Sequence, residues 1–193
     1  MTYVNQKDLA AIKKKLDAFD AVREQIINAS RMIIKHAKHA IVCVHDHNLP
    51  EAAKLLQQAE KELAPLYTLC SDDLQSVGAY HGCVQEYVEA ACFYHFVMQK
   101  KLLSFSSFKH LSEEDYLLGL CDLTGELARR AVLLVIAKKH TDVVQIHAFV
   151  QEIHDFFLEL YLRNGELRKK YDSIKWNLKK IEEILYDLSV RKK

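Results

Sequence analysis

The stretch CVQEYVEAACFYHFVM, residues 83–98, decides the fold prediction because it is long and almost continuously apolar. Its only formal charges are Glu86 and Glu89, whose spacing of three places them on one face of an α-helix. A second stretch, YLLGLCDLTGELA at 116–128, has the same character, with Asp122 and Glu126 at a spacing of four. Neither stretch contains a Lys or Arg that could neutralise its acids. Each of two apolar helices therefore presents a pair of carboxylates.

Helical periodicity extends outward from these stretches over nearly the whole chain. The 193 residues include only 5 Gly and 2 Pro, so turns are few and helices must be long. Asn48 and Pro50 end a first helix, Ser112 is a candidate N-cap, and Asn164-Gly165 is a stop signal. The pattern predicts helices at about 8–45, 51–69, 83–103, 113–139, 141–162 and 166–189. We therefore expect an all-α bundle that forms one domain over residues 1–193.

Composition limits the compartment and the kinds of partner. The formal net charge is +1, so any nucleic-acid surface must be local. The cysteines are odd in number and lie in apolar patterns, which favours reduced core thiols: Cys43, Cys70, Cys83, Cys92 and Cys121. The N-terminus is unlike a signal peptide, and no apolar run approaches the ~18 residues of a membrane span. We expect a soluble, cytoplasmic protein without membrane association.

The four carboxylates most simply suggest a divalent-metal site. A carboxylate in apolar surroundings is costly unless it is paired, protonated or bound to a metal. If the helices predicted at 83–103 and 113–139 pack together, Glu86 and Glu89 can meet Asp122 and Glu126. Oxygen ligands suit Mg²⁺ or Mn²⁺, and such an ion could hold a phosphodiester and activate an attacking water.

Other interpretations of these residues stay open. The acids could lie on a solvated stripe, although their mostly apolar neighbours disfavour this. A carboxylate di-iron centre needs Glu-x-x-His on two helices, but Glu86 is followed at that spacing by Glu89, and Glu89 by Cys92. His45 and His47 also invite a metal interpretation, but a solvated helix terminus is favoured there.

At these residues the sequence resembles the translin family. QEYVEAACFYHF (85–96) looks like the QEYVEA helix of the family. DYLLGLCDLTGELARR (115–130) looks like the DYLLG-x-x-DLTGEL-x-R motif of its catalytic member, translin-associated factor X (TRAX). LRKKYDSIKWNLKKIEEILYDLSVR (167–191) resembles the tail of translin itself. The resemblance extends over about residues 21–191, and it is closest to the TRAX-like members.

The resemblance implies both an architecture and an activity. It implies a translin-like bundle of six to seven helices that assembles into a hollow homo-octamer, as in prokaryotic and especially archaeal members. It also implies an endoribonuclease that cuts single-stranded or short structured RNA, with single-stranded DNA as a second candidate ligand. The catalytic and metal-binding residues for Mg²⁺ or Mn²⁺ would be Glu86, Glu89, Asp122 and Glu126. The alternatives are a non-catalytic translin-like oligomer that binds nucleic acid and a structural metal-binding bundle that ignores RNA.

A basic stripe on the first predicted helix is the candidate RNA-binding surface. At about 100° per residue, Arg31, Lys35 and Lys38 fall within roughly 60° of arc, and Arg23 precedes them. Phosphate contacts there would make RNA affinity salt-sensitive, whereas the alternative is an ordinary solvated face. Arg129 matches the arginine after GEL in the family, so the resemblance places it at substrate phosphate or in a pair with the acids.

Overall fold

The protein is all-α, as predicted. The computed structural model describes residues 4–69, 77–109 and 111–190. Within these ranges six α-helices and one short 3-10 helix follow each other: α1 Gln6–His45, α2 Leu49–Leu69, α3 Gly78–Gln99, η1 Phe105–Ser107, α4 Glu113–Ile136, α5 His140–Glu159 and α6 Glu166–Val190.

The helix ends show where local chemistry decided the boundaries. The Ser112 side chain accepts a hydrogen bond from the Asp115 backbone N–H at 3.0 Å, which confirms Ser112 as the N-cap of α4. The prediction for α3 was wrong at both ends, because the helix begins at Gly78 and ends at Gln99. Lys100 ends it in the left-handed conformation, with φ of 58°. In the same way Lys138, with φ of 59°, follows the end of α4, short of the predicted 139.

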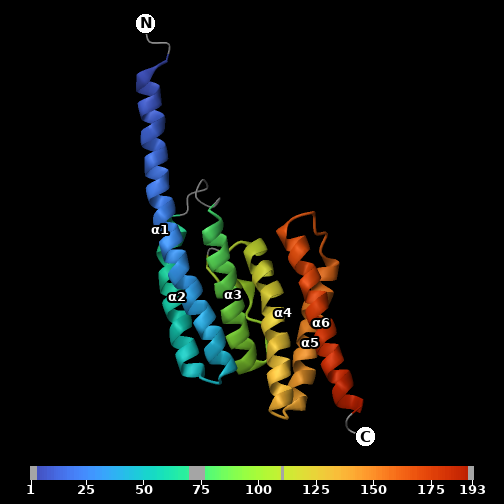
Figure 1. Ribbon diagram of the computed structural model, residues 1–193. Helices are drawn as coiled ribbons and strands as arrows, with labels where there is room; N and C mark the ends of the chain where they lie inside the picture. Colours follow the sequence, from blue (N-terminus) through green and yellow to red (C-terminus); the bar gives the residue numbers. More distant parts are fainter. Residues whose placement is uncertain (1–3, 70–76, 110, 191–193) are drawn as a thin grey trace.

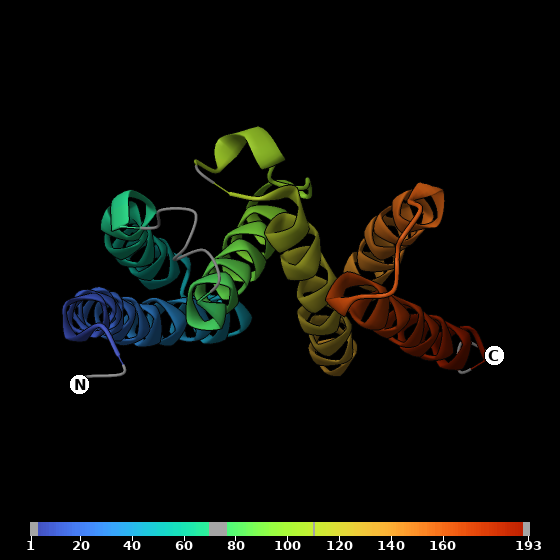
Figure 2. The same cartoon turned by 90° about the horizontal axis from the view of Figure 1, so that it is seen from above.

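The helices are arranged around a central pair, α3 and α4. Helices α1 and α2 pack on the α3 side, and α5 and α6 pack on the α4 side (Figures 1 and 2). The N-terminal half of α1 projects beyond the other helices (Figure 1). Its side chains from Gln6 to Ala21 are exposed, apart from the partly buried Phe19. The bundle therefore packs only the second half of its longest helix.

A glycine allows the central pair to approach closely. A Cβ atom built on Gly119 of α4 would lie 2.7 Å from the Val88 Cγ1 atom and 3.0 Å from the Gln85 carbonyl oxygen of α3. Real Cβ atoms do not approach so closely, so a larger residue would push the two helices apart. This contact brings the acidic residues of α3 and α4 together.

Two predictions about composition can be compared with the structure. Four of the predicted core thiols, Cys43, Cys83, Cys92 and Cys121, are buried and free, whereas Cys70 lies outside the described residues. Among the helices that are described, none combines the length and apolarity that crossing a membrane requires.

Candidate functional site

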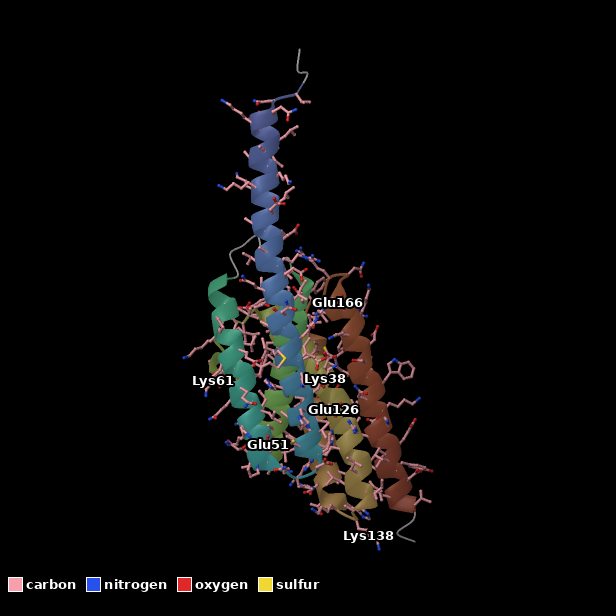
Figure 3. The ribbon with its side chains drawn as sticks, turned by 60° about the vertical axis from the view of Figure 1, so that its left-hand side comes forward. Lys38, Glu51, Lys61, Glu126, Lys138 and Glu166 are labelled. Atoms are coloured by element: carbon pink, nitrogen blue, oxygen red, sulfur yellow. The ribbon has the colours of Figure 1, made fainter. Side chains whose placement is uncertain are left out.

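Three of the four predicted acids line one open cleft. Glu86 and Glu89 reach it from α3 and Glu126 from α4, and the cleft measures about 300 Å³. Lys38 of α1 and Arg129 of α4 also line the cleft. Figure 3 shows Lys38 and Glu126 near each other on these two helices. Asp122 does not line the cleft.

Glu89 is the buried centre of this group. Its side chain is only 8% exposed. No hydrogen bond or ion pair within the described residues reaches its carboxyl group. Burial first, and then the negative charges of Asp122, Glu86 and Glu126, raise the pKa of Glu89 to about 8. The acidic pairs of α3 and α4 therefore lie close together, and the alternative of a solvated stripe is wrong for Glu89.

Each of the three outer acids pairs with a cation, and two of these cations come from other helices. The Lys38 Nζ atom of α1 lies 3.1 Å from the Glu86 Oε1 atom. The Lys170 Nζ atom of α6 lies 2.6 Å from the Asp122 Oδ2 atom. Arg129 pairs with Glu126 one turn away on α4, at 3.6 Å. The two acidic stretches themselves contain no cation, so the pairs with Lys38 and Lys170 were not predicted. The pair of Arg129 with Glu126 is one of the two roles that the family resemblance gave to Arg129.

His45 is a part of the site that sequence reasoning missed. It lies at the end of α1, but it is buried rather than solvated as predicted, and its ring packs 4.8 Å from the Phe93 ring. Its Nε2 atom lies 2.5 Å from the Glu126 Oε2 atom. This hydrogen bond, the largest influence on the carboxyl group, lowers the pKa of Glu126. His47, its neighbour in the HDH sequence, is exposed.

The polar contacts turn the carboxylates toward different partners. Glu86 faces Lys38, Asp122 faces Lys170, and Glu126 faces His45. Across the described parts of the chain, no three His, Cys, Asp or Glu side chains are grouped as a metal site would require. The acids thus form a cluster of charges whose oxygen atoms do not converge on one point.

The predicted basic stripe leads along α1 to this cluster. Arg23, Arg31 and Lys35 are exposed, and the Arg31 Nη1 atom lies 3.5 Å from the Asn28 Oδ1 atom. Lys38 keeps a side-chain exposure of 62% although it pairs with Glu86. Arg31 and Lys38 are two helical turns apart, or about 10 Å along the axis. A polyanion bound along this stripe would reach the cleft.

The fold and site together define a class: an all-α bundle with a buried carboxylate cluster next to a basic helix face. The chain belongs to the translin family, because the Translin family matches residues 21–192. This confirms the family predicted from the acidic helices and the C-terminal segment.

Individual relatives match to different extents. Translin from Gallus gallus is 48% identical over 82 residues, which is 42% of this chain but only 36% of that protein. Translin-associated protein X from Mus musculus is 25% identical over 228 residues, covering 94% of this chain and 77% of that protein. An uncharacterized protein from the archaeon Methanocaldococcus jannaschii is 28% identical over 156 residues, which cover 79% of this chain and 70% of that protein.

Solved structures share the fold. The crystal structure of apo-NeC3PO has a TM-score of 0.86 at 18% identity, covering 96% of this chain and 98% of that one. The AfC3PO–duplex RNA complex also has a TM-score of 0.86, at 20% identity, and the match covers 95% of this chain and 97% of that one. At these identities the likeness establishes a translin-like architecture.

Proposed function

We propose that this protein is a metal-dependent endoribonuclease that hydrolyses phosphodiester bonds in single-stranded or short structured RNA. The observation that supports this best is the buried Glu89 carboxyl group, which has three other acids around it and no hydrogen-bonding partner among the described residues. Such a cluster costs free energy in a structural role, whereas a bound divalent cation would stabilise it. A solved structure of the same fold supports RNA as the ligand, because AfC3PO has been solved in complex with duplex RNA.

The chemistry of the donors fits Mg²⁺ or Mn²⁺. All four candidate ligands, Glu86, Glu89, Asp122 and Glu126, offer carboxylate oxygens, which these hard cations prefer. When bound, the ion supplies charge neutralisation at the phosphodiester and activation of water. To hold it, Glu86 and Asp122 would exchange their lysine partners for the cation.

The chain's own residues would orient the attacking water and bind the substrate. The hydrogen bond with His45 orients Glu126 and lowers its pKa, so this carboxylate would accept a hydrogen bond from a water at the cleft and orient it for attack. Arg129, exposed at the cleft border, is placed to contact a phosphate. Arg31 and Lys35 would hold the RNA backbone farther along α1.

Exposed apolar residues support assembly into a homo-oligomeric shell, which we propose to be the family's octamer. Several lie on the projecting part of α1, namely Leu9, Ile12 and Leu16, each at least 50% exposed. Others lie elsewhere on the described surface, at the end of α4, after α5 and on α6, namely Ile136, Tyr161 and Trp176 at 73%, 103% and 70% exposure. Patches of this kind mark interaction surfaces. Sedimentation velocity would measure the assembly directly, and a monomer at micromolar concentration would contradict it.

A second candidate function is a passive nucleic-acid-binding shell without catalysis. The observation that favours it is the internal pairing of Lys38, Lys170 and His45 with three of the acids, which stabilises them without a metal. The local identity to translin from Gallus gallus points in the same direction.

Labelled single-stranded RNA incubated with Mg²⁺, Mn²⁺ or EDTA separates these functions. Glu89→Gln and Asp122→Asn should each reduce cleavage by more than about 100-fold, because loss of even an outer partner of a metal ligand costs 10–100-fold. RNA affinity, measured by fluorescence anisotropy, should change little. Glu152→Gln, an exposed glutamate on α5, is the matched control. RNA binding without cleavage in the presence of either metal would favour the passive shell. If the wild-type protein shows no salt-dependent RNA binding, only the structural metal-binding bundle would remain.

A further inference from the structure

We infer that Lys170 is a built-in counter-ion of the carboxylate cluster, which holds Asp122 until a divalent cation displaces it and thereby sets the affinity of the site for metal. The inference rests on the proposed metal-dependent function, and it assigns Lys170 a positioning role. It starts from one contact: Lys170 Nζ lies 2.6 Å from the Asp122 Oδ2 atom.

A second contact holds the ammonium group in this position. Lys170 Nζ also donates to the Gln85 Oε1 atom of α3, at 3.4 Å. Both side chains of the ion pair are largely shielded, with exposures of 28% for Lys170 and 33% for Asp122. Lys170 thus connects α6 with the two helices that supply the acids.

The orientation of Gln85 is itself determined by a buried group. Gln85 Nε2 donates to the Asp115 Oδ1 atom at 2.9 Å, which directs the amide oxygen of Gln85 toward Lys170. Asp115 is 3% exposed and also accepts from the Ser112 hydroxyl group at 2.7 Å. A continuous polar chain therefore runs from the N-cap of α4 through Asp115, Gln85 and Lys170 to Asp122.

Lys38 differs from Lys170 in the features that matter for competition. Its side chain is 62% exposed, and Glu86 is its only hydrogen-bonding or charged partner in the described structure. An exposed single ion pair contributes little and exchanges readily. Lys170 has two partners, and its side chain is less exposed to solvent. Its displacement by a metal ion should therefore cost more free energy than the displacement of Lys38. A divalent cation and an ammonium group also repel each other at one carboxylate.

Isothermal titration of Mn²⁺ into the full chain without RNA tests this role independently of cleavage. Lys170→Met keeps the length of the side chain but removes its charge, so Mn²⁺ should bind roughly five- to twentyfold more tightly. Lys170→Arg keeps the charge and should bind Mn²⁺ close to wild type. Lys179→Met, on the exposed part of α6, is the matched control and should leave the affinity unchanged.

The outcomes separate this inference from the proposed function. Wild-type protein that binds Mn²⁺ with the same affinity as, or more tightly than, Lys170→Met would overturn the role of Lys170 while leaving the metal site intact. No binding by wild type or any variant would overturn the metal-dependent function itself. If circular dichroism shows that Lys170→Met does not fold, Gln85→Met provides the test. It removes one anchor of the ammonium group, so Mn²⁺ affinity should rise by a smaller factor, and unchanged affinity would again refute the inference.

Discussion

Replacing Glu89 with glutamine should make the protein less sensitive to alkaline pH. The pKa of Glu89 is raised from 4.5 to about 8 in the folded state. Between these values the folded protein keeps a proton that the unfolded chain has released, so rising pH favours unfolding. Glutamine stays neutral at every pH and has nearly the same shape as glutamic acid. Residue 89 of the Glu89→Gln variant should therefore cause no loss of stability between pH 4.5 and about 8.

The size of the effect follows from the shift. Each unit of pKa corresponds to 1.36 kcal/mol, so the difference between 4.5 and about 8 amounts to roughly 3–5 kcal/mol at alkaline pH. Near pH 5 the wild-type carboxyl group is protonated, and the two proteins should have similar free energies of unfolding. Near pH 9 the variant should be the more stable by about this amount.

Urea denaturation at a fixed protein concentration measures these free energies, with EDTA present because a bound cation would stabilise the ionised carboxylate. The difference between variant and wild type is informative because the other titrating groups cancel in it. Glu152→Gln controls for the loss of an exposed glutamate. If the difference in free energy of unfolding between Glu89→Gln and wild type stays constant from about pH 5 to pH 9, the pKa of Glu89 is not raised by burial and by the neighbouring acids.

Three further perturbations test the packing and the RNA-binding surface. Gly119→Ala should lower the free energy of unfolding by about 1–3 kcal/mol, because its Cβ would lie 2.7 Å from the Val88 side chain. Gly82→Ala is the control, because nothing lies within 4 Å of its Cβ, and this change should be neutral or stabilising. Thermal denaturation compares the two variants. Arg130→Met should cost about 1–3 kcal/mol in urea denaturation, because the buried guanidinium donates to the Val44 carbonyl at 3.2 Å, whereas the exposed Arg129→Met should have little effect. Replacing Arg31 and Lys35 with alanine should reduce the slope of log affinity for RNA against log salt by about 1 per lost phosphate contact; an unchanged slope would exclude the stripe as the binding surface.

Periodicity predicted the helices well where local signals agreed with tertiary packing. Ser112 and the acids after it are a local start signal, and α4 begins there as expected. Helix α3 begins earlier than predicted because Gly78 and Gly82 resemble loop residues, whereas burial of Val77 and Tyr80 stabilises a helix across them. Propensity alone could not show this, since the stabilising contacts come from other helices.

The sequence identified the four acids, Lys38 and Arg129, but it did not identify two partners of the acids. Glu86, Glu89, Asp122 and Glu126 stand out because charge is rare in apolar helices, and that signal is local. Lys170 and His45 have no such signal, because Lys170 is 48 residues from Asp122 and His45 is 81 residues from Glu126. A lysine in a charged C-terminal helix and a histidine next to a turn look ordinary until the fold brings them to the acids.

The projecting half of α1 has a thermodynamic consequence for the protein. A helical segment of this length, with every side chain but Phe19 exposed, is only marginally stable in water on its own. Contacts with another copy over Leu9, Ile12 and Leu16 would provide the missing stabilisation. The folding of this segment then obeys mass action, so its helix content should fall on dilution before the rest of the bundle unfolds. Protein concentration would thus regulate how much of the longest helix exists.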